Sequence, residues 1–479
     1  MLVANRGEIA VRVIRTCRRL GIETVLTVAA GDADSVPARL ADKTIAIGSY
    51  LDVEEVVGAA AAAEAGAIHP GYGFLSENPR LARACEAAGI VFIGPGADVL
   101  EAAGDKLAAR NHAVAAGLPV LPGGLVRTEA AGADGAFGAE GEAGAAGAGA
   151  EGEAGEAGEI AHAADAAGLA GRIGYPVLVK AAGGGGGRGL RVVRDPADLA
   201  GAVAMGSAEA QAAFGDGRVY LERYVSPARH VEVQLLGDGE NVIHLGDRDC
   251  SVQRRYQKLV EEAPAPWLGE TLRVGMRAAA VAFGQHLKYQ GLGTVEFLVD
   301  VARSEFWFLE VNARIQVEHP VTEAVTGLDL VAEQIAVAEG RRLGLSQASV
   351  RLDGHAIECR INAEDPAAGF RPSPGRVTSA VFPAGPGVRV DTHIQAGSAV
   401  PPQYDSLLAK LVVSGTSRAE ALDRLRGALA RCEIGGVATT LPVHAALAAD
   451  DEFAAGGFGT DYLARWLELR TRPVRDKNG

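Results

Sequence analysis

The chain has 479 residues, too many for one compact core, so two or three packed domains are expected. Hydrophobic residues make up 48% of it and charged residues 22%, a globular composition that excludes fibrous and wholly disordered classes. The net charge of −14 argues against a general affinity for nucleic acids.

The cysteines and the apolar runs indicate the compartment. Five cysteines lie far apart without a C-x-x-C pair, which favours reduced thiols over a disulfide framework or a structural zinc site. The apolar runs are too short to cross a bilayer, and charged residues already occur within residues 1–15. We therefore expect a cytoplasmic protein without a membrane segment or an export signal.

The first fifty residues predict the start of a parallel sheet. Residues 2–4, 24–28 and 44–47 have the pattern of short strands, and residues 9–20 that of an amphipathic helix. This order of elements is the opening of an α/β domain. Because no G-x-G-x-x-G motif introduces the helix, a dinucleotide site is not supported here.

A low-complexity segment interrupts the chain at residues 129–159. It consists almost wholly of Gly, Ala and Glu, with eight acidic residues and no Lys or Arg. Such a segment cannot bury enough apolar surface to offset the entropy cost of ordering it. We expect a disordered insertion, for which a neutral expansion is favoured over a docking role.

A glycine-rich loop at residues 183–189 joins two strand-like runs, residues 177–182 and 190–193. A strand follows the loop where a Rossmann fingerprint requires a helix, so the glycines do not indicate a dinucleotide site. In a hairpin, this composition lets backbone N–H groups close over phosphate oxygens without interference from side chains. A phosphate-binding loop is favoured over a simple flexible turn, because a plain hairpin needs only two to five loop residues.

Lysine is rare in this chain, with seven lysines against 39 arginines. Where arginine is the usual cation, a retained lysine suggests that a compact point charge is needed. Lys106, Lys180 and Lys258 are each candidates, although any of them alone could be an ordinary surface residue. Lys180 lies next to the glycine loop and is therefore interpreted as a phosphate ligand.

The most informative pattern is a pair of alternating runs at residues 293–300 and 306–312. If they form a hairpin that turns near Arg303, Glu296 lies opposite Glu310 and Thr294 lies opposite Asn312. Directly opposed carboxylates repel each other unless a cation lies between them. Two carboxylates and an amide oxygen suit Mg²⁺, so the hairpin predicts a magnesium site. Two solvated glutamates are the alternative, which the surrounding aromatic residues disfavour.

Polar residues continue after this hairpin. If the chain stays extended, Arg314, Gln316 and Glu318 share one face, where a cation and a carboxylate would meet the terminal phosphate of a nucleotide. Arg360 lies in a second polar run, and taken alone it is better explained by a structural ion pair.

Together these motifs resemble those of biotin carboxylase, a family of ATP-grasp enzymes. The matching segments appear in the family's order from residue 2 to about residue 463, and they are residues 4–10 (ANRGEIA), 69–78 (HPGYGFLSEN), 180–189 (KAAGGGGGRG), 248–251 (RDCS), 310–320 (EVNARIQVEHP) and 360–365 (RINAED). A series of motifs of this length is far more specific than one glycine pattern.

The resemblance implies a fold that combines α/β and α+β parts. A Rossmann-like N-terminal domain would cover residues 1–97, and an ATP-grasp domain would cover residues 98–340. Within the latter, a mobile lid would span about 119–225 and contain the insertion at 129–159. A C-terminal biotin carboxylase domain would cover residues 341–479.

The resemblance also implies the reaction, namely carboxylation of biotin on a carrier protein by bicarbonate, driven by ATP through carboxyphosphate. The implied cofactors are ATP and Mg²⁺ or Mn²⁺, with biotin as carrier-bound substrate. The implied partners are a biotin carboxyl carrier protein, carboxyltransferase subunits and a second copy of the chain. The resemblance is to subunits of the acetyl-CoA or propionyl-CoA carboxylase type, with fatty acid biosynthesis as an expected process. The sequence leaves open whether the acceptor is acetyl-CoA, propionyl-CoA or pyruvate.

The same resemblance assigns individual residues. The implied metal ligands are Glu296, Glu310 and Asn312. Glu318 would be the base that deprotonates bicarbonate, Lys258, Arg314 and Val317 would contact bicarbonate, and Arg360 would stabilise the biotin enolate. The implied ATP contacts are Lys106, Lys180, Gly186, Gly187, Glu222, Arg223, Tyr224, Val225 and His230, with Tyr256 in a position where the best-known members have histidine.

Two other functions are less consistent with these residues. A carbamoyl-phosphate synthetase-type ATP-grasp ligase also makes carboxyphosphate, but the segments around Glu318 and Arg360 favour the biotin reaction. A non-catalytic scaffold with the same fold is disfavoured because all the candidate catalytic groups are present.

Overall fold

The computed structural model describes residues 1–127, 160–162, 165–181, 190–215 and 217–471. The predicted insertion at 129–159 and the glycine loop at 183–189, with Gly186 and Gly187, lie outside the described residues. The chain divides into two compact units, one formed by Met1–Leu118 with Pro227–Gly479 and the other by Pro119–Ser226. In the described part of the chain, no helix has both the length and the apolar character needed to cross a membrane.

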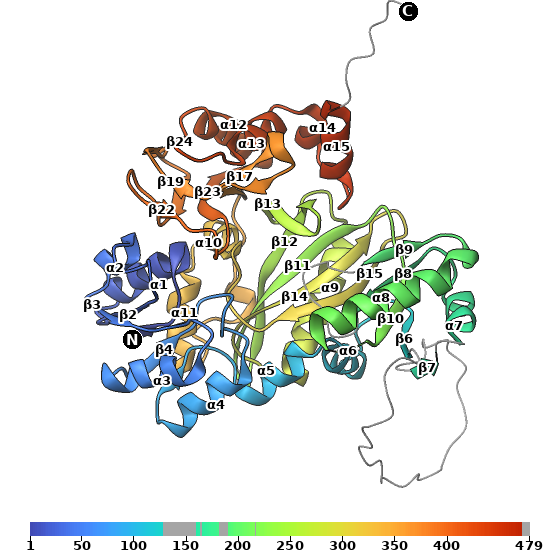
Figure 1. Cartoon of the computed structure of the whole chain (residues 1–479), viewed down its shortest axis with the longest axis horizontal. Coiled ribbons are helices and arrows are strands. Elements are labelled where there is room, and N and C mark those ends of the chain that lie inside the picture. Colours follow the sequence, from blue (N-terminus) through green and yellow to red (C-terminus); the bar gives the residue numbers. More distant parts are fainter. Residues whose placement is uncertain (128–159, 163–164, 182–189, 216, 472–479) are drawn as a thin grey trace, which may run out of the picture. The chain divides into compact units, whose positions relative to one another are not determined.

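The predicted parallel sheet at the N-terminus is confirmed. Its five strands have the order β3-β2-β1-β4-β5, and Leu2 of β1 pairs with Val25 on one side and Ile68 on the other (Figure 1). Helix α1 starts two residues earlier than expected, and its apolar positions Ile9 and Val13, one turn apart, are buried. The strands are β1 (Leu2–Val3), β2 (Val25–Val28), β3 (Lys43–Ala46), β4 (Ala67–His69) and β5 (Val91–Phe92), and the helices are α1 (Gly7–Arg19), α2 (Val36–Leu40), α3 (Val53–Ala62), α4 (Pro79–Ala87), α5 (Ala97–Gly104) and α6 (Lys106–Ala115).

An antiparallel sheet of eight strands, in the order β15-β14-β11-β12-β13-β16-β23-β21, forms the centre of the first unit (Figure 1). The sheet continues across residue 341, because β13 pairs with β16 through partners such as Val260 and Cys359. Its strands are β11 (Arg229–Asp238), β12 (Val242–Arg254), β13 (Gln257–Ala263), β14 (Gln290–Asp300), β15 (Glu305–Asn312), β16 (His355–Asn362), β21 (Val388–Thr392) and β23 (Leu407–Gly415).

Helices and three short two-stranded pairings accompany this sheet. The apolar side chains of α12 and α15, such as Leu425 and Trp466, pack with Ile357 and Leu411 of the sheet in one buried cluster. The helices are α9 (Glu270–His286), α10 (His319–Thr326), α11 (Leu330–Ala338), α12 (Arg418–Leu429), α13 (Leu441–Ala448), α14 (Asp451–Ala455) and α15 (Tyr462–Thr471). The short pairs are β17 (Glu364–Asp365) with β18 (Arg371–Pro372), β19 (Gly375–Arg376) with β22 (Ala399–Val400), and β20 (Ser379–Val381) with β24 (Glu433–Gly435).

The described part of the second unit contains a five-stranded sheet, β7-β6-β10-β8-β9, and the α-helices α7 and α8. The predicted strand pair that flanks the glycine loop is confirmed, because β8 and β9 are antiparallel and Val177 pairs with Val193. Val179 and Leu221 are fully buried in the core of this unit. The elements are β6 (Gly123–Arg127), β7 (Ile160–His162), β8 (Val177–Ala181), β9 (Arg191–Val193), β10 (Val219–Arg223), α7 (Ala166–Ile173) and α8 (Leu199–Phe214).

Candidate active site

The β14–β15 hairpin forms with the predicted register. Glu296 pairs with Glu310 and Thr294 pairs with Asn312, and a register shift follows immediately after Glu296. Glu296 is buried, whereas 39% of the Glu310 side chain is exposed. The hairpin therefore presents one buried and one accessible carboxylate from directly opposed positions.

Buried donors surround the carboxylate of Glu296. Lys258 Nζ lies 2.7 Å from Oε1, and His230 Nε2 lies 2.8 Å from Oε2. The side-chain amides of Asn312 and Gln316 each donate to Oε1 at 2.9 Å. Burial alone would raise the pKa of Glu296, but Lys258 and His230 hold that pKa well below its usual range, so the carboxylate is ionised at neutral pH.

Lys258 is the cation at the centre of this cluster. Its ammonium lies 2.6 Å from Glu232, 2.7 Å from Glu296 and 2.7 Å from Glu318. Burial lowers the pKa of Lys258, but the three carboxylates outweigh it and raise the pKa well above its usual value. The side chain is thus a fixed positive charge that an anionic substrate could share.

Glu318 lies in the turn just before α10, and its carboxylate is almost fully buried. Lys258 contacts one carboxylate oxygen, and Arg360 Nη2 donates to the other at 3.0 Å. Burial raises the pKa of Glu318, whereas Lys258 and Arg360 lower it to well below its usual range. Glu318 therefore has the ionised form that a general base requires.

Arg360 on β16 makes the structural ion pair that its sequence context favoured, and it also contacts the candidate base. It makes a structural ion pair with Glu261, at 2.6 Å, and it also reaches Glu318. Burial is the main reason why the pKa of Glu261 rises to about 7, although Arg360 opposes this shift. The ion pair fixes the guanidinium beside the candidate base.

The segment after Asn312 does not stay extended. The prediction that Arg314, Gln316 and Glu318 share one face depended on an extended chain, so it needs correction. The strand ends at Asn312, the chain bends at Arg314 and turns before α10. Gln316 and Glu318 still reach the Lys258 cluster, but Arg314 turns to Glu77, with 2.9 Å between Nε and Oε2, and to Asn312 Oδ1 at 2.8 Å. The bend therefore separates the partners of Arg314 from those of Glu318.

Lys106 is the first residue of α6, which Asp105 caps by accepting a hydrogen bond from the Ala108 N–H. Its ammonium lies 3.8 Å from Glu310 Oε2, and both side chains are partly exposed. This pair places an accessible cation next to the accessible carboxylate of the hairpin.

Several predicted nucleotide contacts belong to the second unit. Lys180 on β8 pairs with Glu222 on β10 at 2.7 Å, and its ammonium also lies over the Tyr220 ring. Arg223 ends β10, and the Tyr224 N–H donates to Pro176 O. Val225 follows, within the same unit. Glu222 to Val225 thus follow one another along β10 and its extension, and Lys180 lies on the adjacent strand β8.

Two further predicted contacts lie outside the Lys258 cluster. Tyr256 is at the β12–β13 turn, with a left-handed backbone (φ 66°) and a side chain that is 57% exposed. Val317 offers its backbone carbonyl, which accepts a hydrogen bond of 2.9 Å from Lys410 Nζ. Neither residue contributes a side-chain charge to the site.

Sequence reasoning assigned no role to Arg248, although the motif that contains it was recognised. The guanidinium is fully buried, and both of its terminal nitrogens donate hydrogen bonds. Nη1 donates to Gln234 and Thr322, and Nη2 donates to Thr294 and Gln316. Nε donates to Glu232, which also holds Lys258. Arg248 thus positions the partners of both Lys258 and Glu296.

Lys410 on β23 is a second residue without an assigned role, and only its rarity as a lysine could have indicated one. It is fully buried, lies 3.0 Å from Glu8 Oε1 and donates to the carbonyl of Val317, next to Glu318. Burial is the main cause of a raised pKa at Glu8. Lys410 therefore ties α1 to the backbone that carries the candidate base.

Replacement of Lys410 by methionine is expected to lower the free energy of unfolding by about 3–5 kcal/mol at pH 8, because Glu8 is left as an unpaired buried charge. The loss should shrink as the pH falls through the raised pKa of Glu8, since protonation removes that charge. Urea unfolding at pH 8 and at pH 5.5 measures both effects. Lys43→Met is the control, because its pair with Glu23 is mostly exposed, and an equally stable Lys410→Met would contradict this role.

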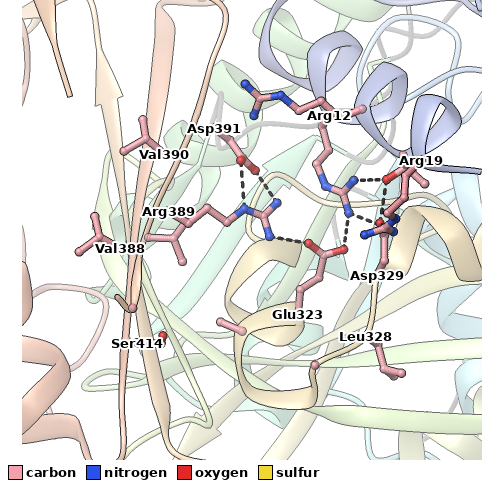
Figure 2. Close-up of a pocket in the computed structure, with 16 residues that line it drawn as sticks. Arg12, Arg19, Glu323, Leu328, Asp329, Val388, Arg389, Val390, Asp391 and Ser414 are labelled. Carbon is pink, nitrogen blue, oxygen red and sulfur yellow. Dashed lines mark hydrogen bonds and ion pairs between the residues drawn. The ribbon is translucent and has the colours of Figure 1, made fainter. Parts of the chain in front are cut away.

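A cavity of about 560 Å³ lies elsewhere in this unit, between α1, the α10–α11 connection and β21. Figure 2 shows that the labelled charged side chains on its walls are paired with one another. Arg12 contacts Glu323 at 2.6 Å and Asp329 at 2.8 Å, and Arg389 contacts Glu323 at 2.7 Å and Asp391 at 2.6 Å. None of the predicted site residues lines it, so this cavity is distinct from the Lys258 cluster.

Three family models match consecutive parts of the chain. They describe the biotin carboxylase N-terminal domain over residues 1–100, the ATP-binding domain of the carbamoyl-phosphate synthase L chain over residues 142–346, and the biotin carboxylase C-terminal domain over residues 358–465. The combination defines an ATP-dependent ligase with an ATP-grasp domain.

Relatives match over nearly the whole chain. The biotin carboxylase of Nostoc sp. (strain PCC 7120) is 45% identical, with 97% of this chain and 98% of the relative covered. A pyruvate carboxylase subunit of Methanothermobacter thermautotrophicus is 44% identical, with 97% and 89% covered. The chain belongs to the biotin carboxylase family.

Solved structures agree with this assignment. A biotin carboxylase from Campylobacter jejuni, described as a β,γ-ATP complex, is 42% identical, with a TM-score of 0.87 and coverage of 97% of this chain and 98% of that one. The biotin carboxylase domain dimer of Hydrogenobacter thermophilus 2-oxoglutarate carboxylase, with MgADP, ADP and bicarbonate, is also 42% identical, with a TM-score of 0.87 and 98% of both chains covered.

Proposed function

We propose that the Lys258 cluster is where this enzyme activates bicarbonate for the ATP-dependent carboxylation of carrier-bound biotin. The observation that carries the proposal is a partly buried ammonium that three buried carboxylates hold, and one of these, Glu318, also accepts a hydrogen bond from Arg360. A small anion that entered here would meet a fixed cation and an ionised base within one contact distance. Few structural roles require so many charges at one buried point.

Within this proposal, Glu318 removes the proton from bicarbonate while Lys258, Arg314 and Val317 contact the anion. A bicarbonate oxygen then attacks the terminal phosphorus of ATP and ADP leaves, which yields carboxyphosphate. Arg360 stabilises the enolate of biotin, the form that accepts the carboxyl group. Glu318 and Arg360 are in contact, so the proposed base and the proposed enolate-stabilising cation lie in the same site.

The cross-strand carboxylates fit the proposed magnesium ligands. Glu296 and Glu310 are directly opposed, and they and Asn312 supply the oxygen donors that Mg²⁺ or Mn²⁺ prefers. When bound, the ion would neutralise phosphate charge. Lys106 beside Glu310 supplies a protein cation that would also neutralise phosphate charge. The other proposed nucleotide contacts are His230, Tyr256 and the second-unit residues Lys180, Glu222, Arg223, Tyr224 and Val225.

The domain limits at 1–97, 98–340 and 341–479, with a lid at about 119–225, remain part of the proposal. The separate compact unit Pro119–Ser226 supports the assignment of a lid. The solved dimer of a related domain supports a homodimer, and the curated relatives support carrier and carboxyltransferase partners. A cytoplasmic location is proposed on the reduced cysteines.

ATP turnover with and without bicarbonate, and with and without free biotin, tests the function. Bicarbonate-dependent ATP cleavage that biotin accelerates is the expected result. A carbamoyl-phosphate synthetase-type reaction would need bicarbonate but not respond to biotin, and a scaffold would show no turnover.

Glu310→Gln is expected to weaken magnesium-ATP binding on the order of tenfold, about 1.4 kcal/mol, because the ion loses a charged ligand. Glu296→Gln should weaken it as well. Calorimetric titration with ATP and Mg²⁺ measures the change. Glu305→Gln, an exposed position at the other end of β15, is the matched control, and equal affinity in all three variants would show that the hairpin does not hold the ion.

The purified chain is expected to carry no covalent biotin. Its three methionines, Met1, Met205 and Met276, do not adjoin a lysine, so the sequence contains no Met-Lys-Met attachment motif. An avidin blot of the purified polypeptide checks this. A positive band on this chain would contradict the need for a separate biotinylated carrier.

A further inference from the structure

Two histidines meet where α6 packs against α9, outside the candidate active site. His112 Nδ1 and His286 Nε2 lie 3.1 Å apart although the residues are 174 positions apart in the sequence, and the ring centroids are 5.3 Å apart. His112 is half-buried and His286 is exposed, so one side of the pair is open to solvent. Neither residue takes part in the proposed reaction.

The distance between the two nitrogens suits a shared metal ion. Metal–nitrogen bonds of about 2.0–2.1 Å place two ligands about 2.9 Å apart at a right angle and about 3.4 Å apart at a tetrahedral angle. The observed 3.1 Å lies between these values. The spacing of the two nitrogens therefore fits two ligands of one ion.

The backbone around the pair also favours a cation. His112 lies in the last turn of α6, and His286 is the last residue of α9. The C-terminal ends of helices carry partial negative charge, so two such ends meet at this point. Imidazole ligands suit Zn²⁺, Cu²⁺ and Ni²⁺, whereas Mg²⁺ prefers oxygen ligands.

We propose that His112 Nδ1 and His286 Nε2 form a binding site for a divalent transition-metal ion, with water in the remaining coordination positions. The ion links α6 to α9. Since α6 begins at Lys106, the link restrains the helix that presents this proposed nucleotide contact. The site itself does not depend on the proposed function, because none of its ligands takes part in that reaction.

Calorimetric titration of the full chain with ZnCl₂, in buffer that contains excess Mg²⁺, tests the site. The variants are His112→Gln and His286→Gln, and the control is His244→Gln, a histidine outside the pair. Loss of a group that only hydrogen-bonds to a metal ligand typically costs 10- to 100-fold in metal affinity, so loss of either ligand itself should cost about 100-fold or more. The control should bind zinc as the unmodified chain does.

Electron paramagnetic resonance of bound Cu²⁺ provides a second readout. Coupling to two ring nitrogens is expected in the unmodified chain and in His244→Gln, and its loss is expected in either pair variant. Zinc affinity and copper coupling that persist in both pair variants would overturn the site. Such a result would assign the ion to other histidine residues of the chain.

Discussion

Glu318→Gln is expected to slow bicarbonate-dependent ATP cleavage by about 10² to 10⁴-fold, the usual contribution of a general base. The substitution keeps the shape of the side chain and one acceptor oxygen for Lys258 or Arg360, but removes the charge that takes the proton. Nucleotide affinity should stay unchanged, because the metal is assigned to Glu296 and Glu310. Single-turnover ATP cleavage and calorimetry, performed on the same preparation, measure the two quantities.

Glu262→Gln is the matched control for this variant. Glu262 is also a buried glutamate, and Arg418 and His355 hold its pKa at about 2 against the effect of burial, but it lies outside the Lys258 cluster. It should lose stability and keep the rate of the chemical step. If Glu318→Gln lost nucleotide affinity while cleavage at saturating ATP stayed normal, Glu318 would be a metal or nucleotide ligand.

Arg248→Met is expected to lower the free energy of unfolding by at least about 3–5 kcal/mol, because Glu232 loses the guanidinium and four neutral acceptors lose their donors. Catalysis should fall with it, since Gln316 and Glu232 position Glu296 and Lys258. Denaturant unfolding, together with ATP cleavage in the fraction that remains folded, measures the effect.

Arg248→Lys separates charge from geometry. A lysine keeps the positive charge near Glu232 but cannot reproduce the planar fork that reaches Gln234, Thr322, Thr294 and Gln316. Its stability should lie between those of Arg248→Met and the unmodified chain.

The stability of Arg248→Met should also depend on pH. Burial already raises the pKa of Glu232, so the loss of unfolding free energy in Arg248→Met should be larger at pH 8 than at pH 5.5, where the carboxylate takes up a proton. No dependence on pH would show that the lost pairing with Glu232 is not the cause of the deficit.

The β14–β15 hairpin could be predicted because its signal is local. Side chains alternate with a period of two, and the position of the turn sets the register, so the pairing of Glu296 with Glu310 follows from a few consecutive residues. The opening of the N-terminal sheet followed from local periodicity in the same way. The apolar face of each of these elements is set by its own residues and does not depend on the rest of the chain.

The segment after Asn312 shows the limit of such reasoning. Alternation continues through Gln316 and Glu318, but the backbone bends because Ala313 N–H and Arg314 bind Glu77, which is distant in the sequence. The assumption of an extended chain was therefore wrong. Gln316 and Glu318 nevertheless reach the cluster around Lys258.

The sequence by itself determined the strands, the opposed carboxylates and, through the motifs, the family and its candidate residues. Only the tertiary structure decided which charges meet. Lys258 joins Glu232, Glu296 and Glu318 because β13, β11 and β14 lie in one sheet whose order differs from their order in the chain. Strand order depends on contacts between distant residues, which no local periodicity encodes. The same reason explains why Arg248 and Lys410 became recognisable as positioning residues only in the folded chain.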